Sequence, residues 1–289
     1  MPHSLEGEDG EKDSGKEWQR TLGVSVSDKF LFIFGTARSG TSALCKLLNK
    51  DPRICLGLER YSAISRTSQF TPALFEENRF FDMQPGDTWY PSLDKFAEHY
   101  AALRHRYGNA EFRGDKIPPL VRRLDYLLQT FPTARLLITV RDIFDVAASY
   151  EARADEGLDW PESRRTMNAI QDWNLMLENS LRHVHESRIH WVIYEDFFSD
   201  PMKFDELYAF LGMTPPPAAR AALALMLGEQ RKRRARRMNR LGEAERALIN
   251  QHARVDLLDR LHAHVRKRAG KKSPTLLSGL CNLLPAWCT

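Results

Sequence analysis

The feature that most constrains the fold is an apolar segment that leads through a glycine-rich turn into a helix. Residues 30–34 (FLFIF) form a continuous apolar run that ends at Gly35, which is typical of a parallel strand buried on both faces. Residues 35–42 (GTARSGTS) form the turn, and residues 43–48 (ALCKLL) favour a helix. Such a turn directs backbone N–H groups and a helix N-terminus at one point, so the pattern predicts an anion-binding site.

Two later apolar runs, at residues 136–140 and 189–193, are similar to the first. Helical patterns lie between the runs, at residues 93–107, 118–131, 143–155 and 162–187. Strands that alternate with helices form parallel sheets whose two faces are covered by the helices. We therefore expect an α/β, P-loop-like fold of three layers, with a central parallel sheet flanked by helices.

We expect one domain at residues 28–270, between two segments of different composition. Residues 1–27 are rich in Gly, Ser, Glu and Asp, and they predict a disordered leader without the apolar core of a signal peptide. Residues 271–289 are an apolar tail whose leucines at helical spacing favour docking on the protein's own core over a partner or membrane contact. No apolar run approaches the roughly 18 residues of a membrane span, so we expect a cytoplasmic protein.

Residues 61–91 combine weak periodicity with many aromatic side chains. They predict either an insertion that binds an acceptor or an irregular stretch that packs its aromatic rings on the core. The four cysteines form no CxxC pair and have no metal-like spacing to the nine histidines. We therefore expect neither a disulfide framework nor a metal site.

The turn at residues 35–42 has the GxxxxG spacing of a P-loop, but Thr41 stands where the P-loop lysine is expected. A nucleoside triphosphatase needs that lysine on its β- and γ-phosphates. The cation of this turn is instead Arg38, inside the loop, while Thr41 and Ser42 add hydroxyl donors. This arrangement counts against ATP chemistry, and a glycine-rich turn without any ligand is the plain alternative.

The strand, turn and helix together resemble the 5′-phosphosulfate loop of sulfotransferases that use 3′-phosphoadenosine-5′-phosphosulfate (PAPS). The likeness is to the branch whose loop contains Arg-Ser-Gly-Thr, which includes protein-tyrosine, bacterial and carbohydrate sulfotransferases. The resemblance implies 3′-phosphoadenosine-5′-phosphate (PAP) as the product. It also implies that five loop residues bind the cofactor: Arg38, Ser39, Gly40, Thr41 and Ser42.

Two later segments resemble further cofactor elements of the same family. Residues 137–142 (LITVRD) contain a strand that ends in an arginine, with a serine eight positions after it. This resembles the 3′-phosphate element and implies that Arg141 and Ser149 bind this phosphate. Residues 192–197 resemble a Tyr-Glu-Asp segment whose tyrosine lies beside the adenine. Tyr194 either packs on the base in this way or is a core tyrosine that caps the strand.

Two more positions acquire catalytic roles from the resemblance. Residues 114–118 (GDKIP) resemble a Lys-Thr-Pro segment, from which Ile117 departs, and imply that Lys116 contacts the bridging oxygen of the leaving group. A lysine in such a loop is otherwise usually solvated. Glu59 lies twenty-one positions after Arg38, as does the catalytic glutamate of tyrosine sulfotransferases, and is the expected general base. Four histidines compete for that role: His99, His105, His183 and His185.

A basic run at residues 231–237 (RKRRARR) carries six positive charges in a chain of formal net charge +4, which leaves −2 for the rest. The resemblance implies a segment that closes over the 3′-phosphate, through Arg231 and Lys232 among others. A solvated basic face and a nucleic-acid patch are the alternatives.

These patterns predict a PAPS-dependent sulfotransferase in which Glu59, Lys116 and Arg38 are catalytic and no metal is required. The acceptor would be a hydroxyl or amine compound, with carbohydrates and glycolipids among the candidates. A P-loop kinase or nucleoside triphosphatase is one rival, and it requires ATP and magnesium. A non-catalytic nucleic-acid-binding protein is the other, although we expect a small-molecule or glycan partner and no nucleic acid. Neither the acceptor nor the oligomeric state follows from the sequence.

Overall fold

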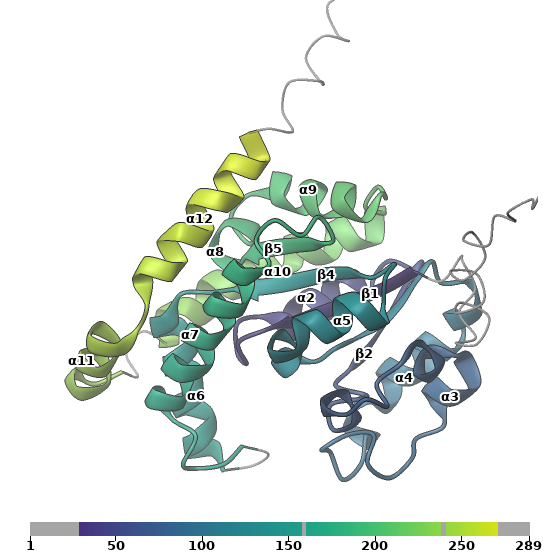
Figure 1. Cartoon of the computed structure of the whole chain (residues 1–289), viewed down its shortest axis with the longest axis horizontal. Coiled ribbons are helices and arrows are strands. Elements are labelled where there is room, and N and C mark those ends of the chain that lie inside the picture. Colours follow the sequence, from purple (N-terminus) through teal and green to yellow (C-terminus); the bar gives the residue numbers. More distant parts are fainter. Residues whose placement is uncertain (1–28, 158–159, 238–240, 271–289) are drawn as a thin grey trace, which may run out of the picture.

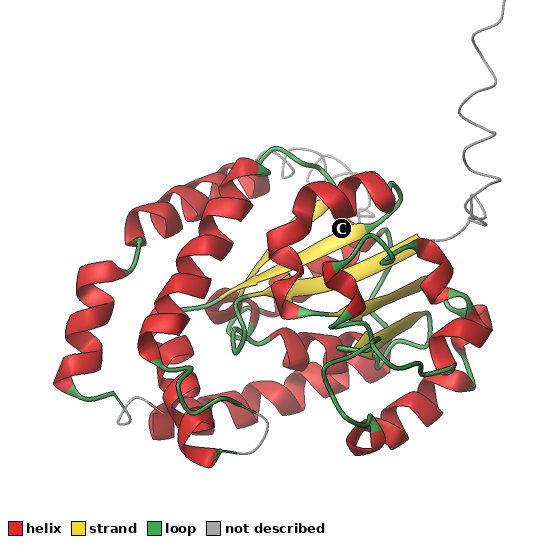
Figure 2. Cartoon of the chain, turned by 60° about the horizontal axis from the view of Figure 1, so that its bottom comes forward, coloured by secondary structure: helices red, strands yellow, loops and turns green. Residues whose placement is uncertain are grey.

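The centre of the protein is a sheet of five parallel strands, with helices on both of its faces (Figures 1 and 2). The structure, a computed structural model, describes residues 29–157, 160–237 and 241–270. The strand order is β2-β3-β1-β4-β5. The strands are β1 (Lys29–Gly35), β2 (Ile54–Leu58), β3 (Phe112–Lys116), β4 (Arg135–Val140) and β5 (Ile189–Ile193). The expected α/β architecture with a parallel sheet between helical layers is confirmed.

Strand β1 shows how the apolar run at residues 30–34 supplies both faces of this sheet. Phe30, Phe32 and Phe34 enter one hydrophobic cluster, while Leu31 and Ile33 enter a second one on the opposite face. Successive side chains of a strand point to opposite faces, so a run without polar residues can be buried only between two layers. Strand β1 therefore occupies the middle of the sheet, paired with β3 and β4.

Different helices cover the two faces. The face of Phe32 packs against α5 (Leu124–Thr130), α6 (Ile143–Glu156), α7 (Thr166–Arg182), α11 (Glu243–His252) and α12 (Val255–Gly270). The face of Ile33 packs against α2 (Thr41–Leu48), α8 (Tyr194–Phe197), α9 (Pro201–Leu211) and α10 (Pro217–Arg237). The short helices α3 (Glu77–Phe81) and α4 (Ala97–Arg104) lie near the β2 edge of the sheet (Figure 1).

Two of the expected helices have nearly the predicted bounds, and two are divided. Helices α6 and α7 correspond to the patterns at 143–155 and 162–187. The pattern at 118–131 becomes a 3₁₀ segment, η5 (Pro118–Arg123), followed by α5. The pattern at 93–107 likewise begins with a 3₁₀ turn, η3 (Asp94–Phe96), and continues as α4.

Strands β2 and β3 were not expected from the sequence. Strand β3 (FRGDK) contains three charged residues and a glycine, so no apolar run marks it. Its last two residues are nevertheless buried, because they lie between β1 and β2 in the interior of the sheet.

The aromatic segment at residues 61–91 divides between its two predicted roles. Tyr61, Phe70 and Phe75 are buried and pack with Phe32 of β1, as the core alternative predicts. Trp89 and Tyr90 instead line the main cavity of the protein, together with residues of the 3₁₀ segments η1 (Ile64–Arg66) and η5. The remaining 3₁₀ segments are η2 (Pro72–Phe75) and η4 (Tyr107–Asn109).

The expected leader and apolar tail lie outside the described residues. Within the described part, no helix combines the length and apolar character needed to cross a membrane. Cys45 and Cys55 are buried free thiols, and Cys281 and Cys288 belong to the segment that is not described.

Candidate functional site

The site residues expected from the sequence gather where the five strands end. Arg38 follows β1, Glu59 follows β2 and Lys116 is the last residue of β3. Arg141 follows β4 directly, and Tyr194 follows β5. Parallel strands bring their carboxyl ends to one edge, and open α/β sheets bind ligands outside that edge. The fold thus brings residues more than 150 positions apart in the sequence to one place.

The turn at residues 35–42 wraps tightly around the end of β1. Gly40 has φ 100°, and a Cβ atom at this position would lie 2.4 Å from the ring of Tyr194. Only glycine combines this backbone conformation with such a close approach. The Ser39 hydroxyl donates to the Thr36 carbonyl oxygen (2.6 Å) and contacts Thr139 Oγ1 (2.5 Å), so it holds the shape of the loop. Thr41 and Ser42, at the start of α2, line the cavity.

Arg38, Ser149, Arg141 and Tyr194 form one connected group beside this loop. The Arg38 Nε atom donates a hydrogen bond of 3.0 Å to Ser149 Oγ. The Arg141 guanidinium lies 4.2 Å from the centre of the Tyr194 ring and donates to the Arg38 carbonyl oxygen (3.4 Å). Its other terminal nitrogen is 2.8 Å from Asp145 Oδ2. Two cations and an aromatic face therefore adjoin the anion loop.

Polar atoms without partners mark this group as a place for an anion. Arg141 Nε and Thr36 Oγ1 are buried and have no hydrogen-bond partner among the described residues. Native proteins rarely leave such donors unpaired, because burying an unsatisfied polar group is costly. Donors of this kind, next to a loop at a helix N-terminus, fit phosphate groups. The residues present thus fit the phosphorylated nucleotide that the resemblance implies.

Glu59 and Lys116 form a second group on the β2 side of the loop. Lys116 Nζ lies 2.5 Å from Glu59 Oε1. Lys116 is only 3% exposed, so the alternative of a solvated loop lysine is excluded: it is the buried last residue of β3, and its charge is paired. The Glu59 side chain is 25% exposed and lines the cavity. The Glu59 carboxylate is therefore presented at the cavity wall, paired with the buried ammonium group of Lys116.

The backbone is strained at both Arg38 and Glu59. Their φ angles are 67° and 61°, and they are the non-glycine residues with positive φ among those described. Residues with a Cβ atom rarely adopt this left-handed region, and such strain clusters at functional sites. Arg38 and Glu59, whose side chains line the cavity on either side of the end of β3, are thus held in unfavourable backbone conformations.

The buried carboxylate of Asp115 supports the strained turn at Glu59. It accepts hydrogen bonds of 2.8 Å from the backbone N–H groups of Tyr61 and Lys116. Gly57 makes room for it, since a Cβ atom there would lie 2.8 Å from Asp115 Oδ1. Burial raises the pKa of Asp115 to about 7, although the Tyr61 hydrogen bond and the charge of Lys116 oppose the shift. Asp115 is therefore a positioning residue that connects β3 to the turn.

Replacing Asp115 with Asn is expected to change how stability depends on pH. The pKa of Asp115 is raised from 3.8 in the unfolded chain to about 7 in the folded protein, so its contribution to stability is lost as pH rises across this range. The unfolding free energy of the parent protein should therefore fall, relative to Asp115→Asn, between about pH 4 and pH 8. Urea unfolding at several pH values measures this, with the exposed Asp94→Asn as control. Equal pH slopes for parent and variant would contradict the assignment.

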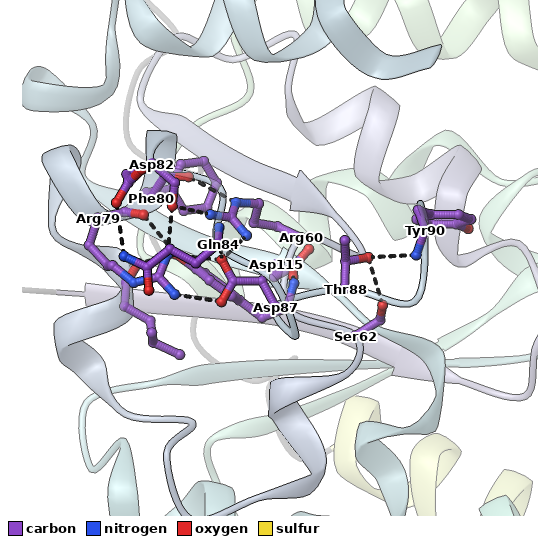
Figure 3. Close-up of polar contacts among 12 residues, drawn as sticks. Arg60, Ser62, Arg79, Phe80, Asp82, Gln84, Asp87, Thr88, Tyr90 and Asp115 are labelled. Carbon is purple, nitrogen blue, oxygen red and sulfur yellow. Dashed lines mark hydrogen bonds and ion pairs between the residues drawn. The ribbon is translucent and has the colours of Figure 1, made fainter. Parts of the chain in front are cut away.

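A strap at residues 82–90 lies beside Arg60 and Ser62 of the turn that follows β2 (Figure 3). Its anchor is the buried Asp87, which pairs with Arg60 (2.6 Å) and with Arg79 (2.5 Å). Burial alone would raise the pKa of Asp87, but the hydrogen bonds from Arg79 and the Gln84 backbone lower it. Near the end of the strap, Thr88 Oγ1 donates to the Glu59 carbonyl oxygen at 2.9 Å. This hydrogen bond ties the strap to the backbone of Glu59, the candidate base.

Asp115 and Asp87 were both missed at the sequence level. Asp115 lay within the motif at 114–118, and its position before a buried lysine was a signal that could have been used. Nothing local distinguishes Asp87 from an ordinary loop aspartate, because its partners Arg60 and Arg79 are identified only by the fold.

A cavity of about 1000 Å³ lies over the loop. Its walls come from the loop, Glu59, η5, and facing parts of α6 and α7. The four competing histidines do not line it; His99 contacts the Leu56 carbonyl oxygen and His183 pairs with Asp125. Arg231 and Lys232 lie on α10, but their side chains are outside the described part of the structure. Among the described residues, no group of three or more His, Cys, Asp or Glu is placed to hold a metal ion.

Comparisons with known proteins identify similar sequences and folds. A profile described as Sulfotransferase family matches residues 31–217, which is more than half of the chain. The sulfotransferase STF9 from Mycobacterium avium is 16% identical, with 74% of this chain and 72% of STF9 aligned and a TM-score of 0.43. STF1 from Mycobacterium tuberculosis H37Rv is 21% identical, over 73% and 74%, with a TM-score of 0.44. Mouse SULT7A1, solved with PAP, is 15% identical, over 71% and 68%, with a TM-score of 0.45. No curated protein matches the sequence.

Proposed function

Because the chain belongs to the sulfotransferase family, we propose that it transfers the sulfuryl group of PAPS to a hydroxyl or amine group of an acceptor bound in the cavity. One observation carries the proposal. The Glu59 carboxylate lines the cavity beside the loop that carries Arg38, and it is paired with the buried ammonium group of Lys116. A base, a buried cation and an anion site in this arrangement suit the transfer of a charged group to a nucleophile.

The cofactor would be held by the two groups of residues around the loop. Backbone N–H groups of residues 38–42 and the hydroxyl groups of Thr41 and Ser42 would bind the 5′ end, with Arg38 beside them. Arg141, with its unpartnered Nε atom, and Ser149 would bind the 3′-phosphate, and Tyr194 would pack on the adenine. We further propose that the basic run, through Arg231 and Lys232, contributes to cofactor binding. PAPS, when bound, supplies an activated sulfuryl group.

The chemistry of the acceptor would depend on Glu59 and its supports. Glu59 takes the proton from the acceptor hydroxyl, and Asp115 and Thr88 hold the turn from which it projects. Lys116 and Arg38 stabilise the negative charge that develops on the oxygen atoms near them. These cations supply the electrostatic stabilisation that a metal ion gives in many phosphoryl transferases, so we propose that no metal is required.

Parallel titrations of the full-length protein with PAP, AMP and ATP plus magnesium test the proposal. PAP should bind about 30- to 150-fold more tightly than AMP, since a charge-assisted contact to the 3′-phosphate contributes roughly 2–3 kcal/mol. A preference for ATP with magnesium would instead support a P-loop kinase or triphosphatase, and equal affinity for PAP and AMP would remove the 3′-phosphate assignment. Tight, salt-sensitive binding of RNA or DNA that persists after Arg38→Ala would support the nucleic-acid rival.

A further inference from the structure

Two arginines that line the cavity form no ion pair within the described part of the chain. Arg122 and Arg164, which also line the cavity, both pair with Asp172, and Arg153 pairs with Glu156. Arg66 and Arg123 line the same cavity, but neither forms an ion pair with a carboxylate of the described residues. Unpaired cations on the wall of a concave site concentrate a positive potential there.

These two arginines lie close together in the fold. Arg123, at the end of η5, donates hydrogen bonds of 2.6 Å to the carbonyl oxygens of Ser65 and Thr67. Those two residues flank Arg66 in the sequence, so Arg123 is tied to the backbone on both sides of its neighbour. Its guanidinium also stacks on Tyr126, 3.8 Å from the ring centre. The positive charge of Arg123 is therefore held in place by neutral groups, which leave it available to attract an anion.

Next to Arg66 lies Trp89, an exposed aromatic residue whose backbone is held by hydrogen bonds. Trp89 is 61% exposed, and the Arg66 guanidinium lies 4.8 Å from the centre of its ring. The backbone N–H of Trp89 donates to Ser62 Oγ at 3.1 Å, and the hydroxyl of the preceding Thr88 donates to the Glu59 carbonyl oxygen. Figure 3 shows Thr88 bonded to Ser62 and to the backbone of Tyr90. A large aromatic side chain on an anchored backbone binds a flat ring at low entropic cost.

Resting on the proposed function, we propose that Arg66, Arg123 and Trp89 form the acceptor subsite, and that the acceptor is a ring compound bearing an anionic group. The ring stacks on Trp89, and the carboxylate, phosphate or sulfate group binds the two guanidinium groups. The Thr88 bond connects this subsite to Glu59, so a hydroxyl of the same ring is presented to the base. The cofactor residues Arg141 and Ser149 lie across the anion loop and take no part.

Equilibrium binding to the PAP-loaded full-length protein tests this with a matched pair of probes. 4-Nitrophenyl β-D-glucuronide and 4-nitrophenyl β-D-glucoside differ only in the carboxylate that replaces a CH₂OH group. Quenching of tryptophan fluorescence and calorimetry should show that the glucuronide binds about 10-fold more tightly or better, as expected for a charge-assisted contact. Competition by glucose 6-phosphate and glucose 6-sulfate, each compared with glucose, shows whether phosphate or sulfate is preferred to carboxylate.

Variants separate this subsite from the cofactor site. Arg66→Ala should remove most of the preference for the glucuronide while leaving PAP affinity unchanged, and Trp89→Ala should weaken both glycosides. Arg104→Ala is the matched control, since Arg104 is an exposed arginine stacked on Phe81 that does not line the cavity. Because Arg123 also anchors backbone, Arg123→Lys, which keeps the charge, is compared with Arg123→Gln, and only the latter should lose the preference.

Equal affinity for the two glycosides would overturn the proposal. It would also be overturned if Arg66→Ala reduced the affinity for PAP as much as the affinity for the glucuronide. Failure of the proposed function is seen separately, in the titrations of PAP against AMP. The glycoside comparison is repeated without PAP, so that the preference is measured whether or not the nucleotide binds.

Discussion

The variant Glu59→Gln is expected to lower turnover by about 10²- to 10⁴-fold, which is the usual contribution of a general base. Glutamine keeps the size of the side chain, and its amide oxygen can still accept the hydrogen bond from Lys116, but it does not take up the acceptor proton. The affinity for PAPS should change little, because Glu59 lies on the β2 side of the loop, away from the residues proposed to bind the 3′-phosphate. Single-turnover rates with labelled PAPS, and a separate PAP titration, measure the two quantities.

Two further variants make this result specific. Glu98→Gln, at an exposed position of α4, is the matched control and should retain full activity. Lys116→Ala should also reduce turnover, with some loss of nucleotide affinity because its charge lies beside the loop. Urea unfolding of each variant shows whether the loss of activity reflects unfolding, since Lys116 is buried and its pairing contributes to stability. Nearly full turnover in Glu59→Gln would place the base elsewhere.

The second large effect is expected for Arg141→Ala, which should weaken PAP binding by about 30- to 150-fold, corresponding to a lost charged contact of roughly 2–3 kcal/mol. The binding of AMP, which lacks the 3′-phosphate, should change far less. Calorimetry with both nucleotides measures this difference, and Ser149→Ala should show a smaller effect of the same kind. Equal losses for PAP and AMP would mean that Arg141 supports the loop rather than the 3′-phosphate.

A double variant distinguishes the loss of a phosphate contact from a loss of stability caused by removing Arg141. Arg141 pairs with the buried Asp145, so its removal leaves a carboxylate without its partner and lowers stability. Asp145→Asn combined with Arg141→Ala removes this buried charge. The PAP-specific loss should persist in the double variant, whereas a loss caused by the stranded carboxylate should be relieved.

Some residues of the candidate site could be predicted because short sequence patterns mark their positions. The apolar run of β1, the glycines of the loop and the arginine after β4 each lie within a few residues of a recognisable strand pattern, and strand ends are where α/β proteins bind ligands. Glu59 and Lys116 were identified by resemblance alone, since the short apolar segment of β2 (ICLGL) was not interpreted as a strand and β3 (FRGDK) has no apolar run. The alternative of a solvated loop lysine at position 116 is excluded only by the fold, because a charged strand resembles a loop until its neighbours are known.

The sequence by itself thus determined the alternation of strands and helices, the anion loop and the family resemblance, because hydrophobic periodicity and turn chemistry act over a few residues. Only the tertiary structure decided which distant side chains meet. Lys116 contacts Glu59 across 57 positions, and Arg38 contacts Ser149 across 111. Both contacts, and the clamp of Asp87, depend on the strand order β2-β3-β1-β4-β5, which is set by packing between elements rather than by any one of them.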